Sequence, residues 1–187
     1  MKAGSIGVIE TERLRLRPWN DEDLLPFAKM NADPRVREYF PSLLSREESD
    51  ASVVRFRQIR ETDGFGFLAA ELREKPTFIG FIGLQTMSFP LPGVSQPAVE
   101  IGWRLTPEVW GRGLATEGAR AVLQVAFTQM QLAEVVAIAV PANLPSRRVM
   151  EKLGMTYDPK EDFDNPRIAD GHPLQRHVLY RIARAAS

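Results

Sequence analysis

The spacing of apolar and polar residues in the first third of the chain predicts one strand and two helices. Residues 14–17 alternate apolar and charged side chains, which is typical of a half-buried strand. Asn20 can cap a helix with an acidic first turn. Ser45, with Glu48 three residues later, forms a capping-box pattern ahead of a second helix.

The rest of the chain changes period several times. Residues 65–72 and 78–84 are rich in aromatic and aliphatic side chains and predict an antiparallel hairpin, and residues 99–105 predict another strand. An amphipathic helix is expected from near residue 115, because apolar residues recur on one helical face up to Met130. The uninterrupted apolar run 135–140 indicates a strand buried on both faces.

The C-terminal part adds a short helix and a last strand. Asn143-Leu144-Pro145 opens the helix, since proline suits a first helical turn, and Gly154 closes it. Residues 174–182 read as the final strand. This order of elements predicts one α/β domain over residues 1–187, with a mixed sheet, because only the later helices can make crossovers between parallel strands.

Composition narrows the class of protein. The 187 residues are 44% hydrophobic and 26% charged, which is enough for one buried core. Lys and Arg number 24, as do Asp and Glu, so no net field attracts nucleic acid or an anionic membrane, and we expect neither partner. No apolar run approaches the ~18–20 residues of a membrane span, and no signal-peptide core is present, so a cytoplasmic protein is expected.

Several chemistries are excluded by the absence of particular side chains. The chain has no cysteine, which excludes disulfides, thiolate metal sites and a cysteine nucleophile. The chain has only two histidines, His172 and His177, which are too few for a histidine-rich metal centre, and we expect no metal. Each of these histidines is interpreted as a surface or loop residue in preference to a catalytic base.

The most informative stretch is residues 107–117, Pro-Glu-Val-Trp-Gly-Arg-Gly-Leu-Ala-Thr-Glu. Gly111 and Gly113 let the backbone approach a ligand closely at the start of a long helix. The unpaired N–H groups there lie at the positive end of the helix and favour an anion, most naturally a pyrophosphate.

Two other interpretations of this stretch remain open from the residues alone. The glycines can simply form a tight turn between strand and helix. Gly111-x-Gly113 also matches the start of a dinucleotide fingerprint, and Glu134 lies 21 residues after Gly113. Against that fingerprint, Thr116 occupies the third glycine position, five residues separate Leu105 from Gly111, and the motif lies late in the chain.

The same stretch resembles the acetyl-CoA pyrophosphate loop of the GNAT acetyltransferases, Gln/Arg-x-x-Gly-x-Gly/Ala. Its form Trp-Gly-x-Gly-x-Ala-Thr-Glu is similar to the branch containing the RimJ/RimL-type ribosomal-protein N-terminal acetyltransferases. Other segments resemble that branch in the same order along the chain: residues 12–18, Asn143-x-x-Ser146, residues 150–155 and Leu179-Tyr180. The resemblance therefore spans nearly the whole chain.

The resemblance implies a fold, a reaction and a binding site. The fold is a mixed, mostly antiparallel sheet of about seven strands flanked by helices. The reaction is transfer of acetyl from acetyl-CoA to a primary amine, a protein N-terminal α-amine or a small-molecule amine, by direct attack. The cosubstrate contacts implied are Trp103, Leu105, Gly111, Arg112, Gly113, Leu114, Ala115, Thr116, Asn143, Ser146 and Arg147.

The catalytic residues are predicted with an alternative for each. Many GNAT enzymes have a tyrosine acid at the position of Met150, and methionine cannot donate a proton. Either Ser146 or a water protonates the leaving thiolate instead, or no acid is needed; Ser146 can equally be a solvated hydroxyl. Glu100, on an otherwise apolar strand, is the candidate base, and its alternative role is an ion pair with an arginine. Asn143 either binds the pantetheine or caps a helix.

A protein of another class is also consistent with these features. A non-catalytic acyl-CoA-binding regulatory module would keep the fold and lack the acid. The acceptor pocket would be shaped by residues 31–46 and 158–173. These segments contain Tyr39, Phe40 and Phe163 with charges of both signs, which suits a peptide or a small amine and excludes few acceptors. The sequence leaves a homodimer open.

Overall fold

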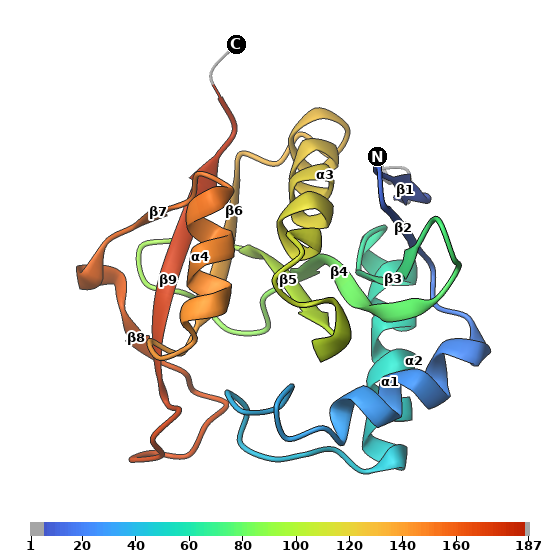
Figure 1. Cartoon of the computed structure of the whole chain (residues 1–187). Coiled ribbons are helices and arrows are strands. Elements are labelled where there is room, and N and C mark those ends of the chain that lie inside the picture. Colours follow the sequence, from blue (N-terminus) through green and yellow to red (C-terminus); the bar gives the residue numbers. More distant parts are fainter. Residues whose placement is uncertain (1–5, 186–187) are drawn as a thin grey trace.

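The computed structural model describes residues 6–185 and has the order of elements that the hydrophobic pattern predicts (Figure 1). The strands are β1 (Ile9–Glu10), β2 (Leu14–Arg17), β3 (Phe67–Leu72), β4 (Phe78–Thr86), β5 (Val99–Leu105), β6 (Glu134–Ala139), β7 (Thr156–Tyr157), β8 (Phe163–Asp164) and β9 (Arg176–Ala183). The helices are α1 (Leu24–Asn31), α2 (Arg46–Asp63), α3 (Leu114–Thr128) and α4 (Leu144–Lys152), with 3-10 turns η1 (Asp21–Asp23), η2 (Pro107–Val109) and η3 (Pro159–Glu161).

The strands form a single mixed sheet in the order β1-β2-β3-β4-β5-β6-β9-β7, with β8 paired to β9. Only β5 and β6 pair in parallel, and the other pairs are antiparallel. The predicted mixed, mostly antiparallel sheet is therefore confirmed. Among residues 6–185 it has nine strands where about seven were expected. Three of the nine, β1, β7 and β8, have two residues each, and two residues cannot display a period.

The two faces of the sheet are covered by different helices. On one face, buried residues of α3 such as Ala119 and Val122 pack against Ile82 and Ile101 of the central strands. On the other face, Phe27 of α1 and residues of α2 pack against an aromatic group from β3 and β4. The central strands are thus covered on both faces, and successive side chains of β5 point to opposite faces, with four of its seven residues half-buried.

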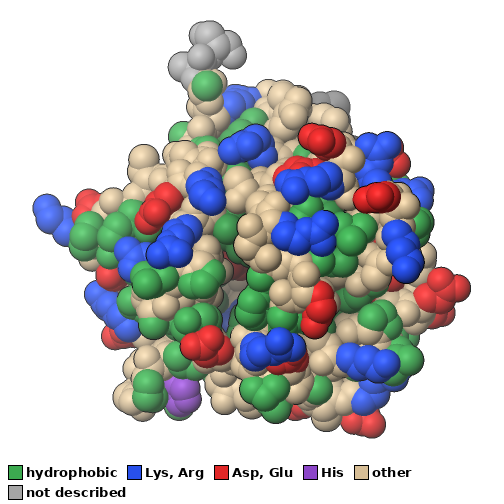
Figure 2. All heavy atoms as spheres, in the orientation of Figure 1, with side chains coloured by type: hydrophobic (Ala, Val, Ile, Leu, Met, Phe, Trp, Pro, Cys, Tyr) green, Lys and Arg blue, Asp and Glu red, His purple; other side chains and the backbone are tan. Residues whose placement is uncertain are grey.

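The sheet splits between β5 and β6. Their parallel ladder has one residue pair, Glu100 with Val136, whereas β4 pairs with β5 along seven residues. Beyond Glu100 the two strands therefore diverge toward their carboxyl ends. Figure 2 shows the surface hollowed between α4 and the segment that joins β5 to α3, with Lys and Arg side chains gathered around this recess.

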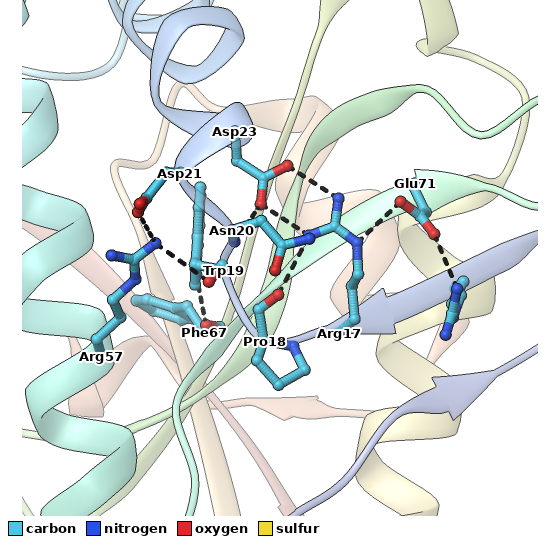
Figure 3. A network of polar contacts seen from close by, with 10 residues as sticks. Arg17, Pro18, Trp19, Asn20, Asp21, Asp23, Arg57, Phe67 and Glu71 are labelled. Atoms are coloured by element: carbon cyan, nitrogen blue, oxygen red, sulfur yellow. Dashed lines mark hydrogen bonds and ion pairs between the residues drawn. The ribbon is translucent and has the colours of Figure 1, made fainter.

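An ion-pair network fixes β2 against the start of the helical region (Figure 3). Arg17 donates two hydrogen bonds to the buried carboxylate of Asp23, at 2.7 and 2.9 Å, and one to Glu71 of β3 at 2.8 Å. Burial of a carboxylate is tolerated because the guanidinium satisfies it bidentately. The network holds η1, and so the start of α1, at a fixed distance from the sheet.

Within residues 6–185, no helix combines the length and the apolar character that crossing a membrane requires. In the same residues no group of three or more His, Cys, Asp or Glu side chains is arranged to hold a metal ion.

Candidate functional site

The loop before α3 presents a row of unpaired backbone amides. Gly111 and Gly113 have φ values of 73° and 78°, a left-handed conformation that favours glycine. Within the described part of the chain, none of the backbone N–H groups from Gly111 to Thr116 donates a hydrogen bond. These amides lie at the positive end of the 15-residue helix α3, which makes them an anion site.

This loop is held in place by the hairpin between β1 and β2. Arg13 Nε donates to Glu117 Oε2 at 2.6 Å, and Arg13 Nη1 donates to the carbonyl of Arg112 at 3.0 Å. Thr11 Oγ1 donates to Glu117 Oε1 at 2.6 Å. Burial opposes ionisation of Glu117, but hydrogen bonds from Thr11 and Arg13 outweigh it and lower the pKa of this carboxyl.

Beside the loop runs a groove of about 580 Å³, lined by charged side chains of both signs, the carboxylates being Glu10, Glu12 and Glu117. Its lining includes Gly113, Thr116, Arg13, Arg120 and Lys152. Arg120 also donates to the carbonyl of Lys152 at 3.1 Å, which links α3 to the end of α4. Sequence reasoning did not assign Arg13, Glu117 or Arg120 to the site, although Arg13 and Glu117 belong to the two segments that carry the family resemblance.

Trp103 and Leu105 offer backbone groups to the split in the sheet. The amide of Thr106 donates to Ile79 on β4 at 2.9 Å, and antiparallel neighbours exchange hydrogen bonds at every second residue. Leu105 and Trp103, one and three residues earlier, therefore direct their backbone groups to the other edge, where β6 has diverged. Trp110 Nε1 donates to the Leu105 carbonyl at 2.7 Å. An extended ligand can add to this edge as a strand would.

Asn143 and Ser146 lie across the split at the start of α4. Asn143 is the N-cap residue, and its Oδ1 accepts from the backbone amide of Ser146 at 3.2 Å. The helix-capping role is thus present in the structure, while the Nδ2 group of Asn143 is a separate donor that capping does not use. Both residues are half-buried.

Arg147 and Met150 occupy the side of α4 that faces β9 and the core. Arg147 donates to the Tyr180 hydroxyl at 3.3 Å and to the carbonyl of Pro141 at 3.1 Å, and its guanidinium lies 5.3 Å from the Tyr157 ring centroid. Arg147 was expected to contact the cosubstrate, but two of its three guanidinium nitrogens, Nε and Nη1, already donate to groups of the protein. Met150 is buried at 2% exposure in the main core, where it packs and cannot exchange protons.

Glu100 is placed where β5 and β6 still touch. Its carboxylate accepts from Gln85 Nε2 on β4 at 2.7 Å. No lysine or arginine forms an ion pair with it among residues 6–185, and Arg167 acts on it only at longer range. Burial therefore raises the pKa of Glu100, because the neutral Gln85 amide and the distant cation compensate only in part.

The two histidines make structural contacts. His172 Nδ1 accepts from the backbone amide of Leu174 at 3.1 Å within a turn. His177 is buried rather than at the surface, contacts the Gln175 carbonyl at 3.1 Å through Nδ1, and lies 5.8 Å from the Phe163 ring. Burial lowers the pKa of His177, which keeps the ring neutral.

A second group of polar residues lies on the opposite face of β5. Glu100, Gly102 and Arg104 alternate with Ile101, Trp103 and Leu105, so they face the side of α1 and α2. Arg104 Nη1 donates to Asn31 Oδ1 at 2.9 Å, at the end of α1. Arg104 was not predicted as a site residue. Its spacing in the strand, two positions after Gly102 and four after Glu100, places it on the same face as Glu100 and could have identified it.

A row of free amides at a helix start, opening onto a split in a sheet, suits a ligand with a pyrophosphate and an extended arm, as in CoA-dependent acyltransferases. The chain belongs to the GNAT acetyltransferase family, since residues 13–156 match the family model described as "Acetyltransferase (GNAT) domain". The resemblance found in the sequence is therefore confirmed, and with it an acetyl-CoA-dependent acyltransferase.

Individual relatives agree with this assignment over the whole length. An uncharacterized N-acetyltransferase of Bacillus subtilis, YnaD, is 30% identical over 93% of this chain and 95% of its own. A crystal structure of an acetyltransferase from Agrobacterium tumefaciens is 29% identical, with a TM-score of 0.77, covering 96% of each chain.

A second structure supports the RimJ/RimL-type fold. RimL, a ribosomal L7/L12 alpha-N-protein acetyltransferase in complex with coenzyme A, has a TM-score of 0.74 and 14% identity, covering 95% of this chain and 98% of that one. At this identity the likeness concerns the fold.

Proposed function

We propose that this protein transfers the acetyl group of acetyl-CoA to a primary amine, by direct attack of the amine nitrogen on the thioester carbonyl. The observation that carries the proposal is the continuity between the unpaired amides of residues 111–116 and the free edge of β5. Both features fit one ligand, because a pyrophosphate and a chain of amide groups need hydrogen-bond partners of these two kinds.

The binding residues divide between the loop and the two strand ends. The amides from Gly111 through Arg112, Gly113, Leu114 and Ala115 to Thr116 hold the pyrophosphate. Trp103 and Leu105 offer backbone partners to the pantetheine arm, and Asn143 donates to it through Nδ2 from across the split. Arg147 contributes positive charge at the start of α4 while it holds the Tyr180 hydroxyl.

The proton movements fall to Glu100 and Ser146. Acetyl-CoA supplies the activated acyl group when bound. A carbon–nitrogen bond forms and the carbon–sulfur bond breaks, so the amine must lose a proton and the sulfur must gain one. Glu100 accepts the amine proton through a water, and its raised pKa makes it a better base. Ser146 passes its hydroxyl proton to the departing sulfur and regains one from water, which suits a site where Met150 has no proton to donate.

An α-amine is the acceptor that needs least from this site. With a pKa of ~7.8, an α-amine is about one-quarter neutral at pH ~7.3, whereas a lysine amine of pKa ~10.4 is neutral in roughly one molecule per thousand. A single carboxylate acting through water is an adequate base for an α-amine and a weak one for a lysine amine. RimL acts on an α-amine according to its description, which supports the same acceptor class. Since acetyl-CoA must be supplied, we place the reaction in the cytoplasm.

An acceptor screen tests this function. Release of free CoA thiol from acetyl-CoA is followed with peptides of varied N-terminal residue, free amino acids and polyamines. Turnover that requires a particular amine supports the transferase. Tight CoA binding without thiol release for any amine would instead establish the regulatory acyl-CoA-binding module.

A further inference from the structure

Two arginines at the acceptor side of β5 are enclosed by protein without a carboxylate partner. Arg104 has a buried Nε with no hydrogen-bond partner, and its one side-chain bond goes to the neutral amide of Asn31. Arg37 is 9% exposed and donates from Nε to the carbonyl of Ser42 at 2.8 Å. No Asp or Glu oxygen lies within 4.0 Å of either guanidinium among residues 6–185.

Both guanidiniums pack on the same aromatic ring. The Phe40 centroid lies 4.3 Å from the Arg37 carbon Cζ and 4.2 Å from that of Arg104. Arg104 also lies 5.3 Å from the Phe81 ring centroid. Cation–π attraction offsets part of the desolvation of the two guanidiniums, but the two like charges, gathered at one ring, still repel each other.

The electrostatics of the pair favour a negative ligand. Burial, and secondarily the neighbouring Arg37 charge, lower the pKa of Arg104 to about 9. Burial also lowers the pKa of Arg37, and the more distant Glu48 compensates only partly. A buried cation is ordinarily paired, so this cluster has a missing partner of opposite charge.

The cluster lies next to the proposed reaction site. Arg104 and Glu100 share one face of β5 and are four residues apart, a strand distance of roughly 13 Å between backbones. The loop carrying Arg37 and Phe40 also approaches the segment ahead of the glycine loop, where Arg35 lies 3.9 Å from Glu108 of η2. The unpaired charge therefore faces the side of β5 from which an amine would reach Glu100.

We propose that Arg104, assisted by Arg37, binds a carboxylate of the acceptor, so that the preferred substrate is an amine carrying a negative group. This inference rests on the proposed function and specifies its substrate class. The carboxylate has two sources, the main-chain carboxylate of a free amino acid or an acidic side chain near a peptide N-terminus. Arginine suits either, since its planar fork matches carboxylate geometry.

The test compares matched acceptors that differ in one charge. Free amino acids are compared with their amides, and Ala-Asp-amide with Ala-Asn-amide, in kcat/KM for wild type, Arg104→Gln and Arg104→Lys. Wild type should prefer the charged member of at least one pair by about 10–100-fold, the range of a hydrogen bond to a charged group. Arg104→Gln should abolish the preference mainly through KM, and Arg104→Lys should restore part of it.

A matched control and a binding measurement keep the result interpretable. Arg15→Gln removes an exposed arginine on β2, remote from β5, and should keep the wild-type preference. Thermal stabilisation by N-acetylalanine and by its amide, each in the presence of CoA, reports carboxylate binding without turnover. If wild type prefers free amino acids to their amides, N-acetylalanine should stabilise it more than the amide does, and Arg104→Gln should lose the difference.

The outcomes separate the two proposals. Turnover of both members of every pair at equal kcat/KM overturns the carboxylate subsite and leaves the transferase intact. Stabilisation by N-acetylalanine without any acetyl transfer overturns the transferase and keeps the anion subsite. The peptide and amino-acid pairs show which source of carboxylate the subsite takes.

Discussion

Gly113 combines two properties, a left-handed backbone and an open approach to the amides of the loop, and a side chain at this position affects both. In Gly113→Val, a β-branched residue at φ 78° is strained, by about 1–3 kcal/mol, and its side chain covers the anion site. We expect loss of CoA binding by at least tenfold in a protein that still folds, measured by calorimetry.

The matched control for this change is Gly171→Val. Gly171 has the same φ of 78° and no atom within 4 Å of the position its Cβ would take, so it carries the same strain away from the loop. Its variant should lose similar stability and keep CoA affinity. If folded Gly113→Val bound CoA as tightly as Gly171→Val does, residues 111–116 would form only a turn and would not bind the pyrophosphate.

Glu100 is the residue whose proposed role depends most on pH. If its carboxylate takes the proton of an α-amine, Glu100→Gln should lower kcat/KM by ~10–100-fold at neutral pH. The loss should shrink toward pH 9.5, because more of the amine is then neutral in solution. Parallel wild-type and mutant profiles from pH 6 to 9.5 would contradict the base. Glu108→Gln, a change at an exposed carboxylate, is the control.

At the scale of elements, one carboxylate joins the β1–β2 hairpin to α3. Glu117 accepts from Thr11, from the Arg13 backbone and from the Arg13 side chain, and its pKa is lowered as a result. In Glu117→Gln the charge is lost, and we expect about 1 kcal/mol less unfolding free energy at neutral pH, together with weaker CoA binding because Arg13 no longer supports the Arg112 carbonyl.

The pH dependence of that difference follows from the direction of the shift. A carboxyl with a lowered pKa in the folded state stabilises fully above its unfolded pKa, and this contribution is lost as pH falls through the folded value. The gap between wild type and Glu117→Gln should therefore close in acid. Urea unfolding at a series of pH values measures this difference in unfolding free energy. A difference that stays constant down to acid pH would show that the Glu117–Arg13 ion pair does not stabilise the fold.

Elements with a clear period could be predicted from the sequence, and their ends followed from identifiable caps. Ser45 and Glu48 exchange hydrogen bonds at 3.1 and 2.7 Å, as the capping-box pattern indicates. The two-residue strands β7 and β8 could not be predicted, because they depend on pairing with β9 and not on local pattern. The split of β5 from β6 is likewise a property of two distant segments.

At the scale of the whole molecule, the sequence indicated which segments form the site, whereas side-chain partners needed the structure. The glycine loop and the strand carrying Glu100 were identified because their residue types are unusual for their positions. The contact of Glu100 with Gln85 joins two strands, and that of Arg147 with Tyr180 joins α4 to β9; no local spacing encodes either of them. The arginine pair around Phe40 has the same origin, since Arg104 and Phe40 lie far apart in the chain.

The fold and the loop together predict which nucleotide stabilises the protein. At ~100 times Kd, a ligand that binds only the folded state contributes about 2.7 kcal/mol, which corresponds to roughly 5–10 °C in a protein of this size. CoA or acetyl-CoA should produce such a rise in melting temperature and NAD should not. Stabilisation by NAD alone would restore the dinucleotide interpretation of Gly111-x-Gly113.

Acetyl transfer itself, measured on both products, is the most direct test of the proposed function. Once one acceptor is found, its mass and the free CoA thiol are followed together over time with wild type and Gly113→Val. We predict that the amine gains one acetyl group for each thiol released, and that the variant forms neither product at the same acetyl-CoA concentration. Thiol release with no acetylated amine, or equal product formation by the folded variant, would contradict an acetyltransferase that works through residues 111–116.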